Sequence, residues 1–169
     1  MNKRVEDALN EQVNKEFYSA YLYLSMNAYF SEKNLNGFAN FMRVQYQEEI
    51  SHGMKIFDYI MERGGRAKLR PIDEVKLEWK DVIEVFEETC DHEKFITDSI
   101  NSIVDISYEE RDHATTNMLQ WFVKEQVEEE ATAQGLLEQL KMIEGKGAGL
   151  FMIDRELMAR TFVDATQEA

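Results

Sequence analysis

Apolar side chains recur along four long segments of this chain at alternating steps of three and four residues. That spacing places them on one face of a helix, which is the pattern of helices that pack in a bundle. In chain order the four faces read Leu9, Val13, Glu16, Ala20, Tyr23, Asn27 and Phe30, then Phe38, Met42, Gln45, Glu49, His52, Ile56 and Tyr59, then Val82, Phe86, Thr89, Glu93, Ile96, Ile100 and Ile103, then Leu119, Phe122, Gln126, Glu129, Ala133, Leu136, Leu140 and Ile143. With one proline and eight glycines in 169 residues, the pattern predicts an all-α protein with a four-helix bundle.

The lengths of the connections predict how these helices are arranged. Short turns at 34–37 and 109–112 make the first helix antiparallel to the second and the third antiparallel to the fourth. The link between the two pairs, 66–80, is about fifteen residues long and can span the length of the bundle. We therefore expect one long crossover connection.

A glycine-rich break, GKGAG, follows the fourth helix, and an amphipathic segment comes after it. We predict that this segment forms a short fifth helix over about 149–163. Because four helices already close a core, the fifth has to pack outside it, on its own bundle or on another subunit. The whole chain, 1–169, is expected to form a single domain with the bundle over about 3–143.

Charge and composition narrow the class of protein. A formal net charge of −14 repels phosphate backbones, so nucleic acid is not an expected partner. No stretch approaches the roughly 20 apolar residues of a membrane helix, and the N-terminus lacks the apolar run of a signal peptide. The only cysteine, Cys90, cannot form an internal disulfide. We therefore expect a soluble, cytoplasmic protein without a membrane partner.

Each of the four helices carries a glutamate near the middle of its apolar face: Glu16, Glu49, Glu93 and Glu129. A carboxylate in a dry core is costly unless it is protonated, paired with a basic side chain or bound to a cation. No Lys or Arg lies at matching depth on these faces. Metal binding is therefore the prediction, and the alternative is that these are stray polar residues on faces that do not meet.

Glu49 and His52 form an E-x-x-H pair, whose spacing puts both side chains on the same face of a helix. Oxygen ligands with one histidine suit iron or manganese better than a closed structural zinc site. Bundle proteins that hold two iron ions use ligand sets of this kind. A di-iron centre is therefore the specific prediction.

Tyr23 lies on the same face as Glu16, seven residues further along. There it can hydrogen-bond a metal ligand or donate an electron, although packing alone explains a core tyrosine equally well. Cys90, His92 and His113 lack partners at ligand spacing, and we expect no metal role for them.

An acidic run in the fourth helix suggests a further metal site. Glu125, Glu128 and Glu129 share one helix face. Glu48 comes directly before Glu49 in the second helix. These residues predict a third, outer metal site, with a solvated acidic face as the alternative.

Four segments in combination resemble the non-haem ferritins of bacteria and archaea. They are NKEFYSAYLYL around Glu16 and Tyr23, VQYQEEISH around Glu49 and His52, DHEKF at Glu93 and FVKEQVEEE at Gln126. The resemblance covers essentially the whole chain, including the glycine break and the terminal helix. It implies a ferritin-like bundle and a hollow cage of twenty-four subunits that stores oxidised iron as a mineral.

The resemblance also implies roles for individual residues. Glu16, Glu49 and His52 would hold the first iron, and Glu49 would bridge to a second iron held by Glu93 and Glu129. Tyr23 and Gln126 would complete the site beside these ligands. The third-site residues would be Glu48, Glu125, Glu128 and Glu129. The implied reaction is a ferroxidase reaction, in which dioxygen or peroxide oxidises two ferrous ions.

Departures from related families refine this expectation. Bacterioferritins place a haem-ligating Met directly after the E-x-x-H glutamate, where this chain has Ile50, so we expect no haem. Animal ferritins line a channel with carboxylates in the first half of the fourth helix, whereas 113–122 contains none, which leaves the route of iron open. The main competing function is a stand-alone, rubrerythrin-like di-iron peroxide reductase that stores nothing. A DNA-protecting cage and a metal-free structural bundle are further alternatives.

Overall fold

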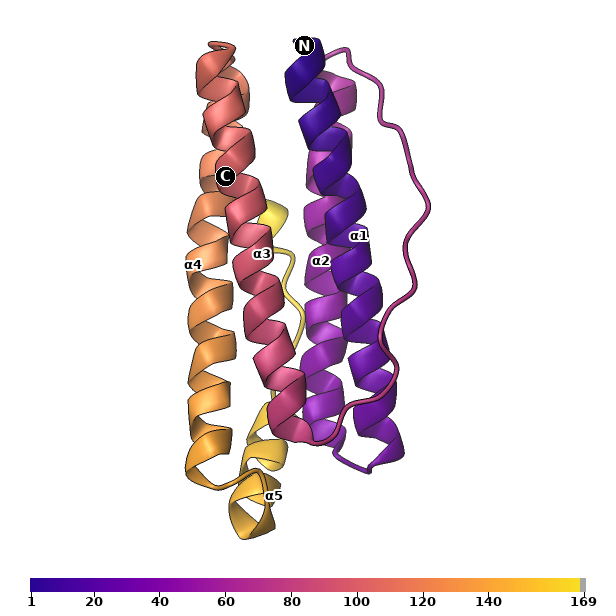
Figure 1. The fold of residues 1–169 in the computed structure, drawn as a ribbon, viewed down its shortest axis with the longest axis vertical. Helices are drawn as coiled ribbons and strands as arrows, with labels where there is room; N and C mark the ends of the chain where they lie inside the picture. The colour runs from indigo at the N-terminus through magenta and orange to yellow at the C-terminus, as the bar shows by residue number, and fades with distance from the viewer. Residues whose placement is uncertain (168–169) are drawn as a thin grey trace.

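The computed structural model describes residues 1–167, which form five α-helices and one 3-10 turn. They are α1 (Lys3–Glu32), α2 (Asn36–Glu62), α3 (Val82–Glu109), α4 (His113–Met142), α5 (Gly147–Leu157) and the 3-10 turn η1 (Ala165–Gln167). The first four lie side by side, with α1 paired to α2 and α3 paired to α4 (Figure 1). The predicted all-α four-helix bundle is confirmed, and the last two residues of the predicted domain lie outside the described residues. Within 1–167 no helix is long and apolar enough to cross a membrane.

The long connection 63–81 runs from the end of α2 along α1 to the start of α3, so that α2 and α3 point in the same direction (Figure 1). Side chains of α1 hold it in place. The amide of Asn10 donates to the carbonyl of Arg66 at 3.1 Å, and the hydroxyl of Tyr29 donates to that of Trp79 at 3.0 Å. The predicted crossover is therefore present and is fixed near both ends.

The core consists of two apolar clusters with a polar layer between them. One cluster contains Phe30, Phe38 and Phe86, and the other contains Leu9 and Ile100. In every one of the four bundle helices, the buried glutamate lies in sequence between residues of the first cluster and residues of the second. The apolar clusters therefore fix a polar layer at one level of the bundle.

The fifth helix ends earlier than predicted. It spans Gly147–Leu157, whereas the sequence pattern predicts a helix to about residue 163, and 158–164 continues as irregular chain. The side-chain amide of Asn40 donates to the carbonyls of Leu157 at 3.0 Å and Arg160 at 2.9 Å. These bonds supply hydrogen-bond donors to carbonyl groups that would otherwise need the N–H groups of a further helical turn.

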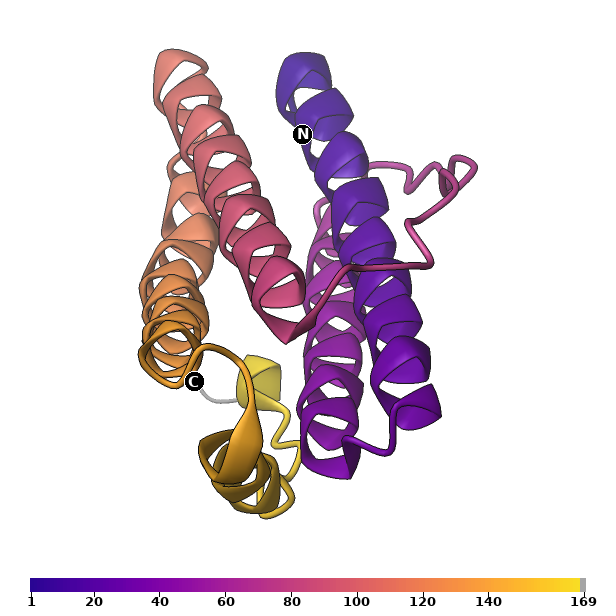
Figure 2. The same cartoon turned by 60° about the horizontal axis from the view of Figure 1, so that its bottom comes forward.

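The helix α5 packs against α2 at the end of the bundle (Figure 2). The Asp154 carboxylate accepts from the backbone N–H groups of Gly37 at 2.8 Å and Phe38 at 3.0 Å, in the first turn of α2. A Cβ atom at Gly37 would come within 1.5 Å of the Asp154 carbonyl oxygen, so this approach requires glycine. Of the two predicted positions for the fifth helix, the structure shows the one on its own bundle.

Candidate metal centre

Four buried glutamates from four different helices meet in the polar layer. Glu16, Glu49, Glu93 and Glu129 are respectively 1%, 2%, 1% and 7% exposed. Glu49 interacts electrostatically with the other three carboxylates. The faces that carry these residues therefore do meet, contrary to the alternative of stray polar residues.

Glu16, Glu49 and His52 form a compact group of potential ligands. Each offers one atom, and these atoms lie within 4.8 Å of one another. His52 Nδ1 is 3.5 Å from Glu49 Oε2, because the three-residue spacing places both side chains on the same face of α2. One helical turn of α2 thus brings an oxygen and a nitrogen ligand to a glutamate of α1.

Two carboxylate oxygens in this group have no hydrogen-bond donor within residues 1–167. They are Oε2 of Glu16 and Oε2 of Glu49, and both are buried. The other oxygen of Glu16 accepts from Gln12 Nε2 at 2.8 Å, and Gln12 in turn accepts from Ser99 at 2.5 Å. A buried carboxylate oxygen without a donor is costly. A divalent cation between the two glutamates would satisfy both, and the oxygen and nitrogen donors suit ferrous iron.

Glu93 has a different environment, because both of its carboxylate oxygens accept hydrogen bonds. The Tyr23 hydroxyl donates to Oε1, and Gln126 Nε2 donates to Oε2 at 3.2 Å. Across the site, Gln45 Nε2 donates to Glu129 Oε2 at 2.9 Å. Tyr23 and Gln126 therefore position Glu93, and Gln45 positions Glu129.

Burial and mutual repulsion favour the protonated form of carboxyl groups at the centre. Burial raises the pKa of Glu49 well above its usual range, and the charges of Glu93, Glu16 and Glu129 raise it further. Burial likewise raises the pKa of Glu93 to about 8, although hydrogen bonds from Tyr23 and Gln126 oppose this shift. Burial thus favours the protonated forms of Glu49 and Glu93, and cations that bind there displace protons.

A second group of potential ligands comprises His52, Glu125 and Glu129, with ligand atoms again within 4.8 Å of one another. Burial raises the pKa of Glu125, and the His52 charge opposes this shift. Glu128, also predicted for a third site, is exposed and belongs to neither group of ligands in the described part of the chain. The outer group therefore shares His52 and Glu129 with the inner centre.

Glu48, the remaining residue predicted for the third site, is paired with a basic side chain. Its Oε2 lies 2.7 Å from Nη2 of Arg160, which follows α5. Burial raises the pKa of Glu48 to about 7, and the positive charge of Arg160 opposes this shift.

Comparison with known proteins identifies the family. A family model described as a ferritin-like domain matches residues 6–143, which is most of the chain. This chain belongs to the ferritin family. The bacterial non-heme ferritin of Bacteroides fragilis strain 638R is 43% identical over 160 residues, which cover 95% of this chain and 99% of that protein. The bacterial non-heme ferritin of Campylobacter jejuni is 39% identical over 155 residues, which cover 92% of this chain and 93% of that protein.

Solved ferritin structures have the same fold. A structure of an open pore ferritin from the archaeon Archaeoglobus fulgidus superposes with a TM-score of 0.94 at 46% identity, covering 95% of this chain and 99% of that one. A closed form of the same ferritin, engineered by mutagenesis, gives a TM-score of 0.95 at 47% identity, covering 96% and 99%. The predicted resemblance to non-haem ferritins is confirmed, and family membership supports iron binding and iron storage.

Several residues that contact the candidate centre or lie near it had no role in the prediction from the sequence. Gln12 bonds Glu16, one helical turn further along, and that spacing was a usable signal, whereas Gln45 bonds Glu129 of α4, which no spacing along the chain indicates. Arg160 gave no signal, because it lies in an irregular segment. His92, for which no metal role was expected, bonds with Ser19 at 2.7 Å, and burial lowers its pKa to about 4.

Proposed function

We propose that this chain is a ferroxidase, which oxidises ferrous iron at a di-iron centre and stores the ferric product inside an oligomeric cage. The observation that carries the proposal is the pair of buried oxygens of Glu16 and Glu49 without hydrogen-bond donors, beside the imidazole of His52. Such a set is stabilised by a hard or borderline divalent cation. Membership of the ferritin family is the reason for choosing iron among such cations.

In this proposal two ferrous ions bind as substrates at adjacent positions. Glu16, Glu49 and His52 hold the first ion, while Glu49 bridges to a second ion held by Glu93 and Glu129. Each ion loses one electron, so the pair reduces dioxygen to hydrogen peroxide, or peroxide to water, with uptake of two protons. The negative charge of the carboxylates favours the ferric product.

The neutral groups around the ligands serve to orient them. The hydroxyl of Tyr23 and the amide of Gln126 hold the two oxygens of Glu93, and the amide of Gln45 holds Glu129. Because these donors are buried, Glu93 and Glu129 lose little rotamer freedom when iron binds.

Storage requires an assembly, and we propose a cytoplasmic cage of twenty-four copies with a third iron position at Glu48, Glu125, Glu128 and Glu129. The similarity to non-haem ferritins over nearly their whole length supports this assembly. Phe151 and Met152 of α5 are each 63% exposed and offer apolar surface for contacts between copies.

The test adds ferrous iron aerobically to the purified metal-free protein, followed by size-exclusion chromatography with iron quantified in each protein peak. A particle the size of a large cage that carries far more iron than its ligand sites supports oxidation and storage together. A small oligomer that retains about two irons per chain would instead favour the peroxide-reductase function, and a protein that binds no iron would overturn both.

A further inference from the structure

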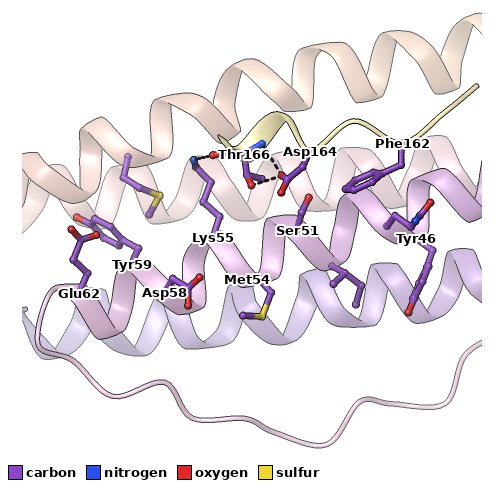
Figure 3. Close-up of a pocket in the computed structure, with 13 residues that line it drawn as sticks. Tyr46, Ser51, Met54, Lys55, Asp58, Tyr59, Glu62, Phe162, Asp164 and Thr166 are labelled. Atoms are coloured by element: carbon purple, nitrogen blue, oxygen red, sulfur yellow. Dashed lines mark hydrogen bonds between the residues drawn. The ribbon is translucent and has the colours of Figure 1, made fainter. Parts of the chain in front are cut away.

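The segment 158–166, which we call the tail, follows α5 and lies along α2. The Lys55 ammonium donates to the carbonyl of Thr166 at 2.9 Å, and Figure 3 shows this contact together with Phe162 beside α2. A cavity of about 690 Å³ lies between α2, the tail and Met118 of α4. The tail is thus attached at separate points beside open space, an arrangement that permits it to move.

Arg160 attaches the tail to Glu48, the residue that precedes Glu49 of the candidate metal centre. Its Nη2 donates to Glu48 Oε2 at 2.7 Å, and its guanidinium lies 4.4 Å from the ring centroid of Phe41. Its Nη1 is buried and has no acceptor within residues 1–167. The ion pair therefore uses one nitrogen only, and it lacks the strength of a two-point arginine–carboxylate pair.

Glu48 interacts both with this guanidinium and with residues of the outer ligand group. It directly precedes Glu49 on α2, and its carboxylate interacts electrostatically with Glu125 and Glu129. The outer group already places three ligand atoms within 4.8 Å of one another. A cation in that group and the guanidinium of Arg160 would therefore compete for the same carboxylate.

We propose that Arg160 is a built-in competitor of the outer metal ion: its guanidinium pairs with Oε2 of Glu48, and an ion held by Glu48, Glu125 and Glu129 binds more weakly because it must share that carboxylate with the guanidinium. Binding of that ion therefore weakens one attachment point of the tail, whereas the hydrogen bonds from Asn40 and Lys55 of α2 remain. This inference rests on the proposed function, because it assumes that the centre binds divalent cations. Arg160 acts through Glu48 and is a positioning residue.

The first test measures zinc binding by isothermal titration calorimetry on the assembled, metal-free protein. Zn²⁺ prefers similar ligands and is not oxidised. We expect Arg160→Gln to bind the third ion per chain about fivefold more tightly than the wild type, since a partly exposed ion pair contributes on the order of 1 kcal/mol. Binding of the first two ions should not change.

Two further variants separate charge from other effects. Arg160→Lys keeps a positive charge near Glu48 and should bind the third ion as weakly as the wild type. Arg155→Gln removes the same charge from an exposed position of α5 and should leave all three affinities unchanged. Equal third-ion affinity in Arg160→Gln and wild type, or weaker affinity in Arg160→Gln, would overturn the proposal.

The second test follows hydrogen exchange of the tail with and without a saturating third zinc ion. In the wild type we expect the third ion to accelerate exchange near residue 160, and in Arg160→Gln the same part of the tail should exchange faster than in the wild type before zinc is added. A tail whose exchange does not respond to the third ion contradicts the inference. If neither of the first two ions binds, the proposed function itself is wrong. If those two ions bind normally and only the response to the third ion is missing, the proposed role of Arg160 alone is wrong.

Discussion

The two halves of the metal centre satisfy their buried carboxylates in different ways. In the α1–α2 half, Glu16 and Glu49 each leave one oxygen without a hydrogen-bond donor among residues 1–167. In the α3–α4 half, Tyr23 and Gln126 supply donors to both oxygens of Glu93. The first half is therefore satisfied by a bound cation or by a proton that Glu49 retains, while the second is positioned by neutral groups before any cation binds. We expect the first ferrous ion to bind in the α1–α2 half.

The largest expected effect comes from removing the carboxylate that the two metal positions share. Glu49→Gln removes one negative charge and one ligand oxygen from the group with Glu16 and His52. We expect the rate of ferrous iron oxidation to fall about a hundredfold or more, measured by stopped-flow absorbance of the ferric product. Glu62→Gln, at an exposed position of the same helix, is the matched control. Rapid oxidation by Glu49→Gln would exclude the bridging role.

Tyr23→Phe tests the half of the centre that is positioned by hydrogen bonds. The change removes the donor to Glu93 Oε1. We expect the second ferrous ion to bind about tenfold more weakly and the first ion to be unaffected, as measured by anaerobic calorimetry. Tyr29→Phe removes a buried hydroxyl that bonds the crossover instead, and its iron binding should match the wild type. Equal weakening of both ions by Tyr23→Phe would show that the two halves do not differ in this way.

The smallest expected effect is a pH dependence of the stability of the metal-free protein. The pKa of Glu93 rises on folding from 4.5 to about 8, so between these pH values the native state binds more protons than the unfolded state. The stabilisation is fully present below pH 4.5 and is lost as pH rises through 8. We expect the calorimetric Tm to fall by roughly 5–10 °C between pH 5 and 8.

Two comparisons sharpen this measurement. Glu93→Gln cannot lose a proton and should reduce the pH dependence of Tm, and the raised pKa of Glu49 should account for part of what remains. Saturating Zn²⁺ should remove it, because bound cations replace the protons. A Tm of the metal-free protein that rises from pH 5 to 8 would contradict the assignment of the retained proton to the centre.

Much of the fold and part of the centre were predictable because they depend on short-range patterns. Apolar residues recur every three or four residues along each helix, so the inward face of the helix and the glutamate on it can be identified without knowing the partner helix. The crossover was predictable because only a long link joins two helices that point the same way. The end of α5 was not predictable, because the side-chain amide of Asn40, far away in sequence, donates hydrogen bonds to the carbonyls of Leu157 and Arg160.

The sequence by itself determined which residues face inward, that four carboxylates would be buried among apolar neighbours, and that such a core needs protons or cations. Only the tertiary structure decided which carboxylate oxygens accept hydrogen bonds from the protein and which remain available to a cation. Gln45 of α2 bonds Glu129 of α4, and Arg160 of the tail pairs with Glu48. The physical reason is range: helical periodicity relates residues one turn apart, whereas these contacts join segments that only the packing of the folded chain brings together.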